Sequence, residues 1–340
     1  MAVCYVGNRE LALRADERRA PGTDEVEIEV AYTGICGTDL HILHGAMDAR
    51  VSLPAVLGHE MSGIVSRVGP GVEGIAAGDA VTVMPLDWCG ACPACAAGNE
   101  HVCHNLDFLG IDSPGSMQSY WIAPARVVVP LPEGLSLEAA ALAEPAAVAV
   151  HDVRRSDLLP GEQALVVGGG PIGLLIASVA TAHGADVLVL EPNETRRQHA
   201  RALGLRAEDP LAGDVQELIG EWTDGAGAPV AFEVSGAVAG LETAIQSLAV
   251  RGRLVVVAIH SAPPPVNLFR VFWRELTLIG ARVYRREDFE HALELLASGA
   301  VSADRLVTSV RPLDQAAAAF EALEQGAELK VLLDCRNGAA

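Results

Sequence analysis

The sequence predicts an α/β protein in which an antiparallel, barrel-like domain precedes a doubly wound parallel sheet. Two changes of pattern along the 340 residues lead to this prediction. Residues 26–130 hold short β-prone segments separated by turns rich in Gly and Pro, as in compact antiparallel barrels. From about residue 163, unbroken runs of Val, Ile and Leu alternate with helical patterns, which indicates a parallel sheet covered by helices.

The β segments of the first domain are EVEIEVAYTG, SGIVSRVG, DAVTVMP and QSYWIAPARVVVPLP. The stretch SLEAAALAEPAAVAVHDVRR follows them and has helical spacing. We expect this helix to break near Pro145, because proline interrupts the interior of a helix.

The second domain begins with a buried strand, ALVVGGG, and a helix, PIGLLIASVATAHG. Further strands are expected at DVLVLEP, VAFEVSG and RLVVVAI, and further helices at ETRRQHARALG and AVAGLETAIQSLAVRG. Two more helices, REDFEHALELLASG and LDQAAAAFEALEQG, and a last strand, LKVLLDC, complete the chain.

Charge and cysteine usage exclude several classes of protein. The formal net charge is −20, with 44 acidic and 24 basic residues, which disfavours nucleic acid and membrane surfaces as partners. Residues 164–182 carry no charge, but Gly-Gly-Gly-Pro within them predicts strand, turn and helix instead of a membrane span. The start of the chain lacks a signal-peptide pattern. Cys4, Cys36 and Cys335 are scattered and the total of seven cysteines is odd, which argues against a disulfide framework, so we expect a cytoplasmic protein.

The loop VVGGGPIG has the G-x-G-x-x-G order of dinucleotide-binding loops, after a strand and at the start of a helix. Gly168 permits the tight turn, Gly170 lets the backbone approach a pyrophosphate, and Gly173 lets helix and strand pack closely. Free N–H groups at the start of the helix would hold the anion. The predicted site therefore includes Ile172 and also Pro171, which opens the helix but has no N–H of its own.

Glu191 ends the next strand, 21 residues after Gly170. Its carboxylate can accept hydrogen bonds from the adenosine ribose and would repel a 2′-phosphate, so the sequence favours NAD over NADP. Arg196 and Arg197 follow closely, and an arginine there could accommodate a 2′-phosphate; Arg196 is included in the predicted cofactor site. An ordinary glycine turn with an exposed, helix-capping Glu191 is the alternative interpretation.

Four cysteines with the spacing C-x2-C-x2-C-x7-C lie in one short loop: Cys89, Cys92, Cys95 and Cys103. Four thiolates fill a tetrahedral zinc shell and leave no position for a substrate, so this site is predicted to be structural. Disulfides and an iron–sulfur cluster are the alternatives, and a reducing compartment argues against the first. His101 and His104 flank the last cysteine and are expected to be exposed loop residues.

A second group of possible metal ligands comes from GICGTDLHILHG and GHEMSG, which contain Cys36, His59 and Glu60. A Cys, a His and a carboxylate could give zinc three protein ligands and one exchangeable position, which is the catalytic arrangement. Taken singly, each residue has an ordinary alternative: a buried thiol, a turn histidine and a surface carboxylate.

Together, these motifs and the AEP at 143–145 resemble, in order and over essentially the whole chain, the zinc-dependent medium-chain dehydrogenase family. The closest likeness is to its polyol, butanediol and threonine dehydrogenase branch. The resemblance implies a GroES-like catalytic β-barrel domain at 1–148 with a structural zinc lobe at about 86–105, a Rossmann NAD-binding domain at 149–284, and a return to the catalytic domain at 285–340.

The resemblance also implies a role for each residue near the catalytic metal. Cys36 and His59 would bind the catalytic zinc, with Glu60 as a ligand in the resting state. Glu144 matches a carboxylate that can exchange with the metal or with water. Asp39 matches the residue that accepts a hydrogen bond from the zinc-bound His59.

Thr38 and His41 match the relay that carries the alcohol proton through the cofactor ribose to solvent. His44 and His151 have no predicted role and are expected to be structural or exposed. Sorbitol-type relatives carry an aromatic residue directly after the relay histidine, where this chain has Ile42. A small diol or another sugar-derived alcohol therefore fits the pattern as well as sorbitol does.

The function expected from the resemblance is reversible hydride transfer between a secondary alcohol and NAD. It would use two zinc ions per chain and a small-molecule alcohol or ketone as the partner. A homodimer or homotetramer is expected, as in relatives. Three other functions are open: a catalytically silent NAD-binding relative with a redox-sensing or scaffold role, a zinc-ribbon nucleic-acid binder, and a zinc-free quinone reductase. The net charge disfavours the second, and both metal patterns disfavour the third.

Overall fold

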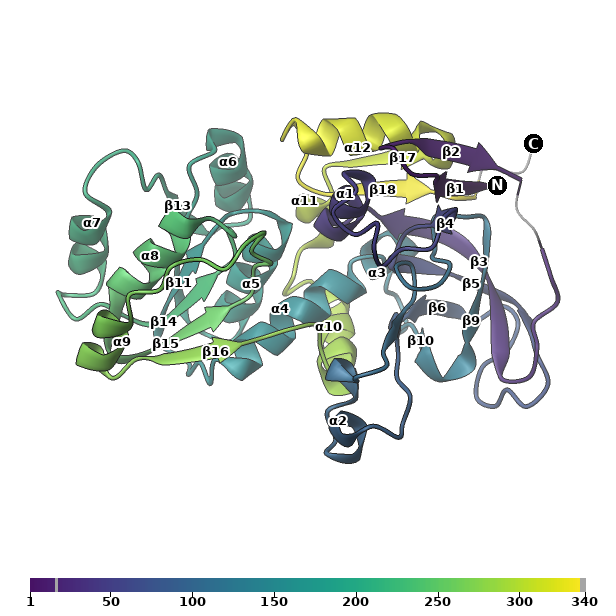
Figure 1. The fold of residues 1–340 in the computed structure, drawn as a ribbon, viewed down its shortest axis with the longest axis horizontal. Helices are drawn as coiled ribbons and strands as arrows, with labels where there is room; N and C mark the ends of the chain where they lie inside the picture. The colour runs from purple at the N-terminus through teal and green to yellow at the C-terminus, as the bar shows by residue number, and fades with distance from the viewer. Residues whose placement is uncertain (16–17, 337–340) are drawn as a thin grey trace. The chain divides into compact units, whose positions relative to one another are not determined.

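The structure is a computed structural model that describes residues 1–15 and 18–336. Its contacts divide the chain into two compact units (Figure 1). Unit 1 contains Met1–Glu144, Arg285–Ala297 and the described residues from Val307 onward. Unit 2 contains Pro145–Tyr284 and Ser298–Leu306.

Unit 1 is built around a seven-stranded sheet with the order β10-β6-β5-β3-β18-β17, in which β9 also pairs with β3. The pairs are antiparallel except for β17 with β18. Its strands are β3 (Glu25–Gly34), β5 (Glu60–Val68), β6 (Ala80–Val83), β9 (Tyr120–Pro124), β10 (Val128–Pro130), β17 (Ser309–Pro312) and β18 (Val331–Asp334).

Strand β3 positions the functional residues of unit 1, because it pairs with both β5 and β18. Its last residue, Gly34, lies opposite Glu60 at the start of β5 and opposite Leu332 near the start of β18. Side chains just after β3, at the start of β5 and just before β18 therefore converge at one corner of the sheet. Alternate residues of β3, namely Val26, Ile28 and Val30, are fully buried, which fixes this register.

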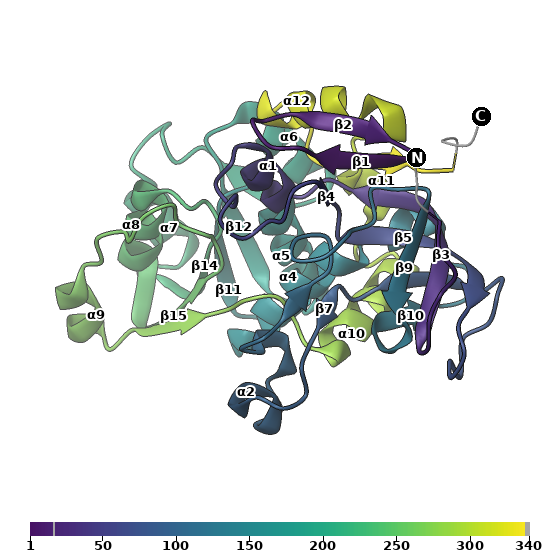
Figure 2. The same ribbon diagram turned by 45° about the vertical axis from the view of Figure 1, so that its right-hand side comes forward.

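The remaining elements of unit 1 surround this sheet. The four-cysteine lobe holds α2, which lies apart from the sheet strands in both views (Figures 1 and 2). The remaining elements are β1 (Ala2–Tyr5), β2 (Leu11–Arg14), α1 (Gly37–Leu43), β4 (Ala55–Val56), β7 (Leu86–Asp87), α2 (Pro93–Ala96), η1 (Glu100–Val102), β8 (Asp107–Phe108), η2 (Ala125–Val127), α3 (Leu137–Ala140), α10 (Arg286–Ala297), η3 (Leu313–Gln315) and α12 (Ala316–Glu324).

Unit 2 is a six-stranded, fully parallel sheet with the order β13-β12-β11-β14-β15-β16, which confirms the predicted doubly wound sheet. Its elements are α4 (Ala143–Arg155, starting at the end of unit 1), β11 (Gln163–Val167), α5 (Pro171–Ala182), β12 (Asp186–Leu190), α6 (Glu194–Ala202), β13 (Arg206–Glu208), α7 (Val215–Trp222), β14 (Ala228–Glu233), α8 (Val238–Ser247), β15 (Leu248–Val256), α9 (Leu268–Arg274), β16 (Thr277–Gly280) and α11 (Ala303–Leu306). No helix among the described residues is long and apolar enough to cross a bilayer.

Two expected boundaries were wrong. The helical stretch before unit 2 breaks at residues 141–142, and Pro145 lies in the first turn of α4, where the missing N–H has no helical partner to lose. The predicted helix ending at 252 stops at Ser247, because Leu248 is buried and pairs with Ala228 as the first residue of β15. The strand β16 and the helices α7 and α9 were not anticipated.

Candidate metal centres and cofactor loop

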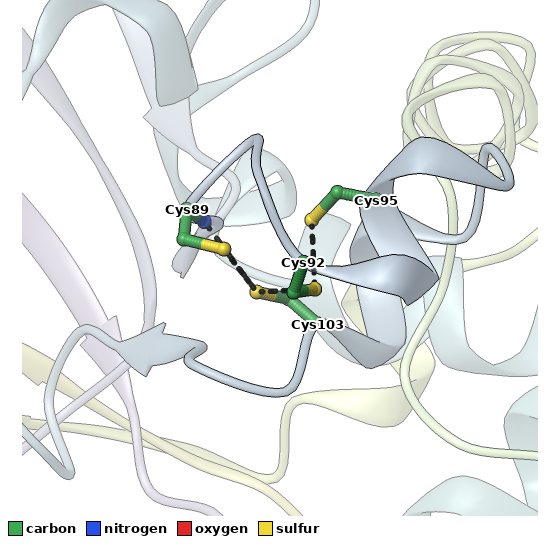
Figure 3. Close-up of side chains that lie close together, drawn as sticks. All are labelled: Cys89, Cys92, Cys95 and Cys103. Carbon is green, nitrogen blue, oxygen red and sulfur yellow. Dashed lines mark hydrogen bonds between the residues drawn. The ribbon is translucent and has the colours of Figure 1, made fainter.

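The four predicted cysteines of the lobe come together in space, with their sulfur atoms pointing toward one another (Figure 3). Cys92 Sγ lies 3.5 Å from Cys95 Sγ and 3.7 Å from Cys103 Sγ, which is 3.5 Å from Cys89 Sγ. A tetrahedral zinc with Zn–S bonds of about 2.3 Å requires sulfur atoms about 3.8 Å apart. The donor set and its spacing therefore fit a zinc ion, and all four cysteines are free of disulfides.

Backbone N–H groups around this cluster favour the thiolate forms. The N–H of His104 donates to Cys92 Sγ at 3.4 Å, and that of Asn105 donates to Cys103 Sγ at 3.3 Å. The N–H of Ala91 and the Asn105 side chain lower the pKa of Cys89 to about 6. Burial raises the pKa of Cys95 to about 12, so this thiol would ionise only with the help of a metal charge.

The two histidines that flank the last cysteine differ in exposure. His104 is exposed, as expected. His101 is half-buried, and its Nδ1 is inaccessible to solvent, so the expectation of an exposed loop residue was wrong for it.

The second group, Cys36, His59 and Glu60, also converges: one possible ligand atom from each lies within 4.8 Å of the others. Cys36 is the residue before α1, two positions after the last residue of β3. His59 and Glu60 open β5 after Gly58, whose φ of +95° suits glycine. The pairing of β3 with β5 explains why residues 24 positions apart in the sequence meet here.

Asp39 lies behind this group and is fully buried. Its Oδ2 accepts a hydrogen bond from the Cys36 N–H at 2.9 Å, and its Oδ1 lies 3.7 Å from His59 Nδ1. Asp39 Oδ1 and His59 Nδ1 are both buried and lack a hydrogen-bond partner among the described residues. The His59 ring therefore directs Nδ1 toward Asp39, which leaves Nε2 for a metal.

The charges of this site act strongly on one another. Burial opposes the charged form of His59, but Asp39 and Cys36 outweigh it and raise the pKa of His59 well above its usual value. Burial also raises the pKa of Asp39, against the opposing effect of His59. A buried, electron-rich set of one thiol, one imidazole and nearby carboxylates suits a divalent zinc ion.

Thr38 and His41 both lie on α1, three residues apart, so they share one face of the helix. Thr38 is half-buried and His41 is exposed. Glu144, at the start of α4, is buried, and its charge contributes to the raised pKa of His59. His44 pairs with Glu324, and His151 is buried within α4.

Residues 22–133 match the family model described as "Alcohol dehydrogenase GroES-like domain", and residues 171–298 match "Zinc-binding dehydrogenase". The chain is also 48% identical, over 98% of both chains, to 2-dehydro-3-deoxy-L-galactonate 5-dehydrogenase of Pseudoalteromonas atlantica. It belongs to the zinc-dependent medium-chain dehydrogenase family.

Two further relatives support this assignment. Sorbitol dehydrogenase of Halalkalibacterium halodurans is 35% identical over 96% of both chains. The crystal structure of 2R,3R-butanediol dehydrogenase from Bacillus subtilis has a TM-score of 0.90 and 34% identity, and the match covers 98% of this chain and 99% of that chain. The predicted GroES-like and Rossmann folds and the predicted class, a zinc-dependent oxidoreductase acting on CH–OH groups, are confirmed.

In this medium-chain dehydrogenase the glycine loop joins β11 to α5. Gly168 has a φ of +112°, and Gly170 is the N-cap of α5 with Pro171 as the first helical residue. A Cβ on Gly173 would lie 1.9 Å from the Gly168 carbonyl oxygen, so only glycine fits there. A Cβ on Gly170 would meet no protein atom within 4 Å, which leaves the open space that a pyrophosphate needs.

Glu191 is buried, and it holds the backbone on both sides of the predicted cofactor site. Its Oε2 accepts from the Gly169 N–H at 2.7 Å, and its Oε1 accepts from the Asn193 N–H at 2.8 Å. Arg196 Nη1 lies 3.8 Å from Glu191 Oε2. Arg197 is turned inward, where it donates to the Glu191 carbonyl oxygen and pairs with Asp209.

Sequence reasoning missed Lys330, which the structure places beside the Cys36–His59–Glu60 group. Its Nζ donates to Glu60 Oε2 and, at 3.1 Å, to the Ile35 carbonyl oxygen. Burial opposes the charge of Lys330, but Glu60 and Cys36 outweigh it and raise its pKa. A signal was present in the sequence, because Lys330 is the only lysine among the 24 basic residues.

Proposed function

We propose that this dehydrogenase catalyses reversible hydride transfer between NAD and a secondary alcohol of a sugar-derived acid. The supporting observation is the 48% identity, along 98% of both chains, to a protein named for oxidation at C5 of a 2-dehydro-3-deoxy sugar acid. The Cys36–His59–Glu60 group supports the chemistry, because it offers a metal three ligands from a buried corner.

In this proposal Cys36 Sγ, His59 Nε2 and Glu60 hold the catalytic zinc, and Asp39 keeps the His59 ring oriented through Nδ1. The four cysteines of the lobe hold a second, structural zinc. When bound, zinc at the first site would supply the Lewis acidity that lowers the pKa of a hydroxyl group. Glu144 offers a carboxylate that can exchange with water near this centre.

Thr38 and His41 would move the proton. The Thr38 hydroxyl would accept the proton of the substrate hydroxyl and donate its own onward. His41, three residues further on the same helix and exposed, would deliver the proton to solvent through the cofactor ribose. Ketone reduction uses the same groups in the opposite direction.

NAD would lie on unit 2, over the carboxyl ends of β11, β12 and β14. The pyrophosphate would bind at the start of α5, against the glycine loop and the first residues of the helix: Gly168, Gly170, Pro171, Ile172 and Gly173. Glu191 is engaged with the backbone through one bond to each oxygen and retains acceptor capacity for a ribose hydroxyl. Its negative charge would disfavour NADP, whereas Arg196 is exposed enough to moderate that preference.

We further propose a homodimer formed through the edge of the sheet in unit 2. Strand β16 ends that sheet and pairs only with β15 among the described strands. The preceding helix, α9, exposes a cluster of large apolar side chains: Leu268, Phe269, Phe272 and Trp273 are 69–74% exposed. An open strand edge beside such a cluster favours pairing with a second copy of the chain.

We also propose a cytoplasmic location, with which the unpaired cysteines are consistent.

A substrate panel tests the enzymatic proposal. Purified protein with its metal content measured is assayed at 340 nm against aldonates, 3-deoxy-2-oxo-aldonates, sorbitol, 2,3-butanediol and L-threonine, each with NAD and NADP. We expect two zinc ions per chain and the highest kcat/KM for an acid substrate with NAD. Higher kcat/KM for sorbitol or butanediol than for every acid would overturn the sugar-acid proposal.

A further inference from the structure

The only lysine of the chain is buried against a proposed zinc ligand. Lys330 is 3% exposed and Glu60 is 1% exposed, although lysine is almost never fully buried unless it is paired. The ammonium group donates to Glu60 Oε2 and to the Ile35 carbonyl oxygen, one residue before Cys36. The lysine thus bonds a carboxylate and a backbone carbonyl from the two segments that carry the metal ligands.

The surrounding backbone leaves this pair little freedom. A Cβ on Gly34 would lie 2.2 Å from Glu60 Oε2 and 3.2 Å from Lys330 Cε, so the two side chains fill the space beside that glycine. The pairing of β3 with both β5 and β18 brings Gly34, Glu60 and Lys330 to the same corner of the sheet. The carboxylate is therefore held by its position and by the ammonium group together.

The charges at this corner explain what the lysine can do. A thiol and two carboxyl groups, from Cys36, Asp39 and Glu60, lie close to one another here, and the ammonium group of Lys330 bonds the last of them. A carboxylate that is bound to an ammonium through one oxygen has only its other oxygen free for a metal. It is also a weaker ligand, because part of its negative charge is already compensated.

We propose that Lys330 is a positioning residue that restrains Glu60, so that this carboxylate stays a weak third zinc ligand and can give up its coordination position during turnover. The inference rests on the proposed catalytic zinc site. Without the charge of Lys330, Glu60 would remain buried with no compensating cation except the zinc, and it would bind the metal more tightly. Loss of this lysine therefore tightens zinc binding while it lowers turnover.

Zinc release tests this proposal without relying on activity. Zinc-loaded wild type and the zinc-loaded Lys330→Met variant are mixed with a chromophoric chelator, and zinc release is followed over time. A Cys36→Ser variant, which is expected to keep only the lobe zinc, identifies the part of the release that comes from the lobe. We expect Lys330→Met to release the catalytic zinc about tenfold more slowly, as about 1.4 kcal/mol of tighter binding would cause. We also expect a loss of about tenfold in kcat, which is the size of loss typical when a group behind a metal ligand is removed. Faster release, or release at the wild-type rate, would overturn the proposal.

Three variants separate this role from a structural one. Lys330→Arg keeps a cation and should restore release to near the wild-type rate, whereas Lys330→Gln keeps a hydrogen-bond donor without charge and should resemble Lys330→Met. The double variant Lys330→Met/Glu60→Gln should lose the slow release, because the freed carboxylate is gone. Arg311→Met, which breaks the pair with Glu328 in the same C-terminal segment, is the matched control and should leave zinc release unchanged.

Spectroscopy supplies a test on the unmodified chain. Protein labelled with 15N and 13C only in lysine gives one side-chain signal, because Lys330 is the sole lysine. We expect an ammonium signal protected from solvent exchange in the zinc-loaded protein, and an exposed-lysine signal there would contradict the proposal. One outcome separates this proposal from the proposed function. If none of the alcohols tested supports NAD reduction by the wild type, but zinc release follows the expected pattern, the proposed function fails and the role of Lys330 stands.

Discussion

Glu191 accepts a hydrogen bond from the Gly169 backbone N–H at 2.7 Å, and this bond joins the end of β12 to the glycine loop after β11. The same carboxylate accepts from the Asn193 N–H at 2.8 Å. A side chain that was predicted to meet the cofactor ribose therefore also sets the shape of the loop that would receive the pyrophosphate. If the proposed cofactor site is right, cofactor preference and loop geometry depend on one residue.

Replacing Glu191 with Gln should reduce the preference for NAD. The variant removes the charge that repels a 2′-phosphate, and a change of about 1.4 kcal/mol alters the ratio of kcat/KM values about tenfold. It should also raise the KM for NAD, because an amide has one oxygen where the loop now uses two acceptors. Steady-state kinetics with NAD and NADP measure both effects. Adding Arg196→Ala to this variant should lower its kcat/KM with NADP again. A ratio of the kcat/KM values for NAD and NADP that is the same in Glu191→Gln as in the wild type would contradict the assignment.

Serine at Cys36 and serine at Cys92 should have different consequences. Cys36→Ser is expected to lose one zinc per chain and more than about a hundredfold in kcat/KM, with a thermal midpoint near that of the wild type, because Cys36 belongs to the proposed catalytic zinc site. Cys92→Ser should instead lower the thermal midpoint and the yield, because it opens a four-sulfur site that closes a loop. Metal analysis and thermal unfolding distinguish the two, and a stable but inactive Cys92→Ser protein with two zinc ions would reverse the assignment.

Asp39→Asn should weaken the catalytic zinc without removing a ligand. The amide can still accept from the Cys36 N–H, but it no longer offers a charge to His59 Nδ1 across 3.7 Å. Changes of this kind typically cost 10–100-fold in metal affinity or activity, so we expect about tenfold faster zinc release and a similar loss of kcat. The zinc in the lobe should be unaffected, and equal loss from both sites would point to general unfolding.

Glu27 should contribute stability that depends on pH. Burial opposes its ionisation, but Arg67, Arg18 and Ser66 outweigh burial and lower the pKa of Glu27 from 4.5 to about 2. Because the unfolded chain takes up this proton first as the pH falls, the stabilisation is complete above about pH 4.5 and is lost toward pH 2. Both arginines are more than 40% exposed, so screening reduces the contribution to about 1–2 kcal/mol.

The Glu27→Gln variant checks this window. Its free energy of unfolding in urea should lie about 1–2 kcal/mol below that of the wild type at pH 7. The gap should close as the pH falls from 4.5 toward 2. Comparing the two proteins cancels changes that both share, such as metal loss in acid. A gap that stays constant with pH would show that Glu27 acts through packing alone.

The sequence alone determined the features that depend on short-range spacing. The four lobe cysteines lie within fifteen residues, and the glycine loop within six, so their spacing restricts the geometry before the chain folds. The alternation of buried strands and helices likewise predicted the parallel sheet of unit 2, because period and apolar content are local properties. The end of the helix at Ser247 was missed because pairing with β14, and not local propensity, makes Leu248 a strand residue.

Only the tertiary structure decided which distant side chains meet. Lys330 and Glu60 are 270 positions apart and touch because β3 pairs with β5 on one edge and with β18 on the other. The approach of Asp39 to His59, and the inward turn of Arg197 beside the half-buried Arg196, also depend on how elements pack and not on any local pattern. Spacing along the chain constrains the geometry of residues that are close in sequence. The partners of a buried charged group are instead decided by strand register and burial, because these bring distant residues together.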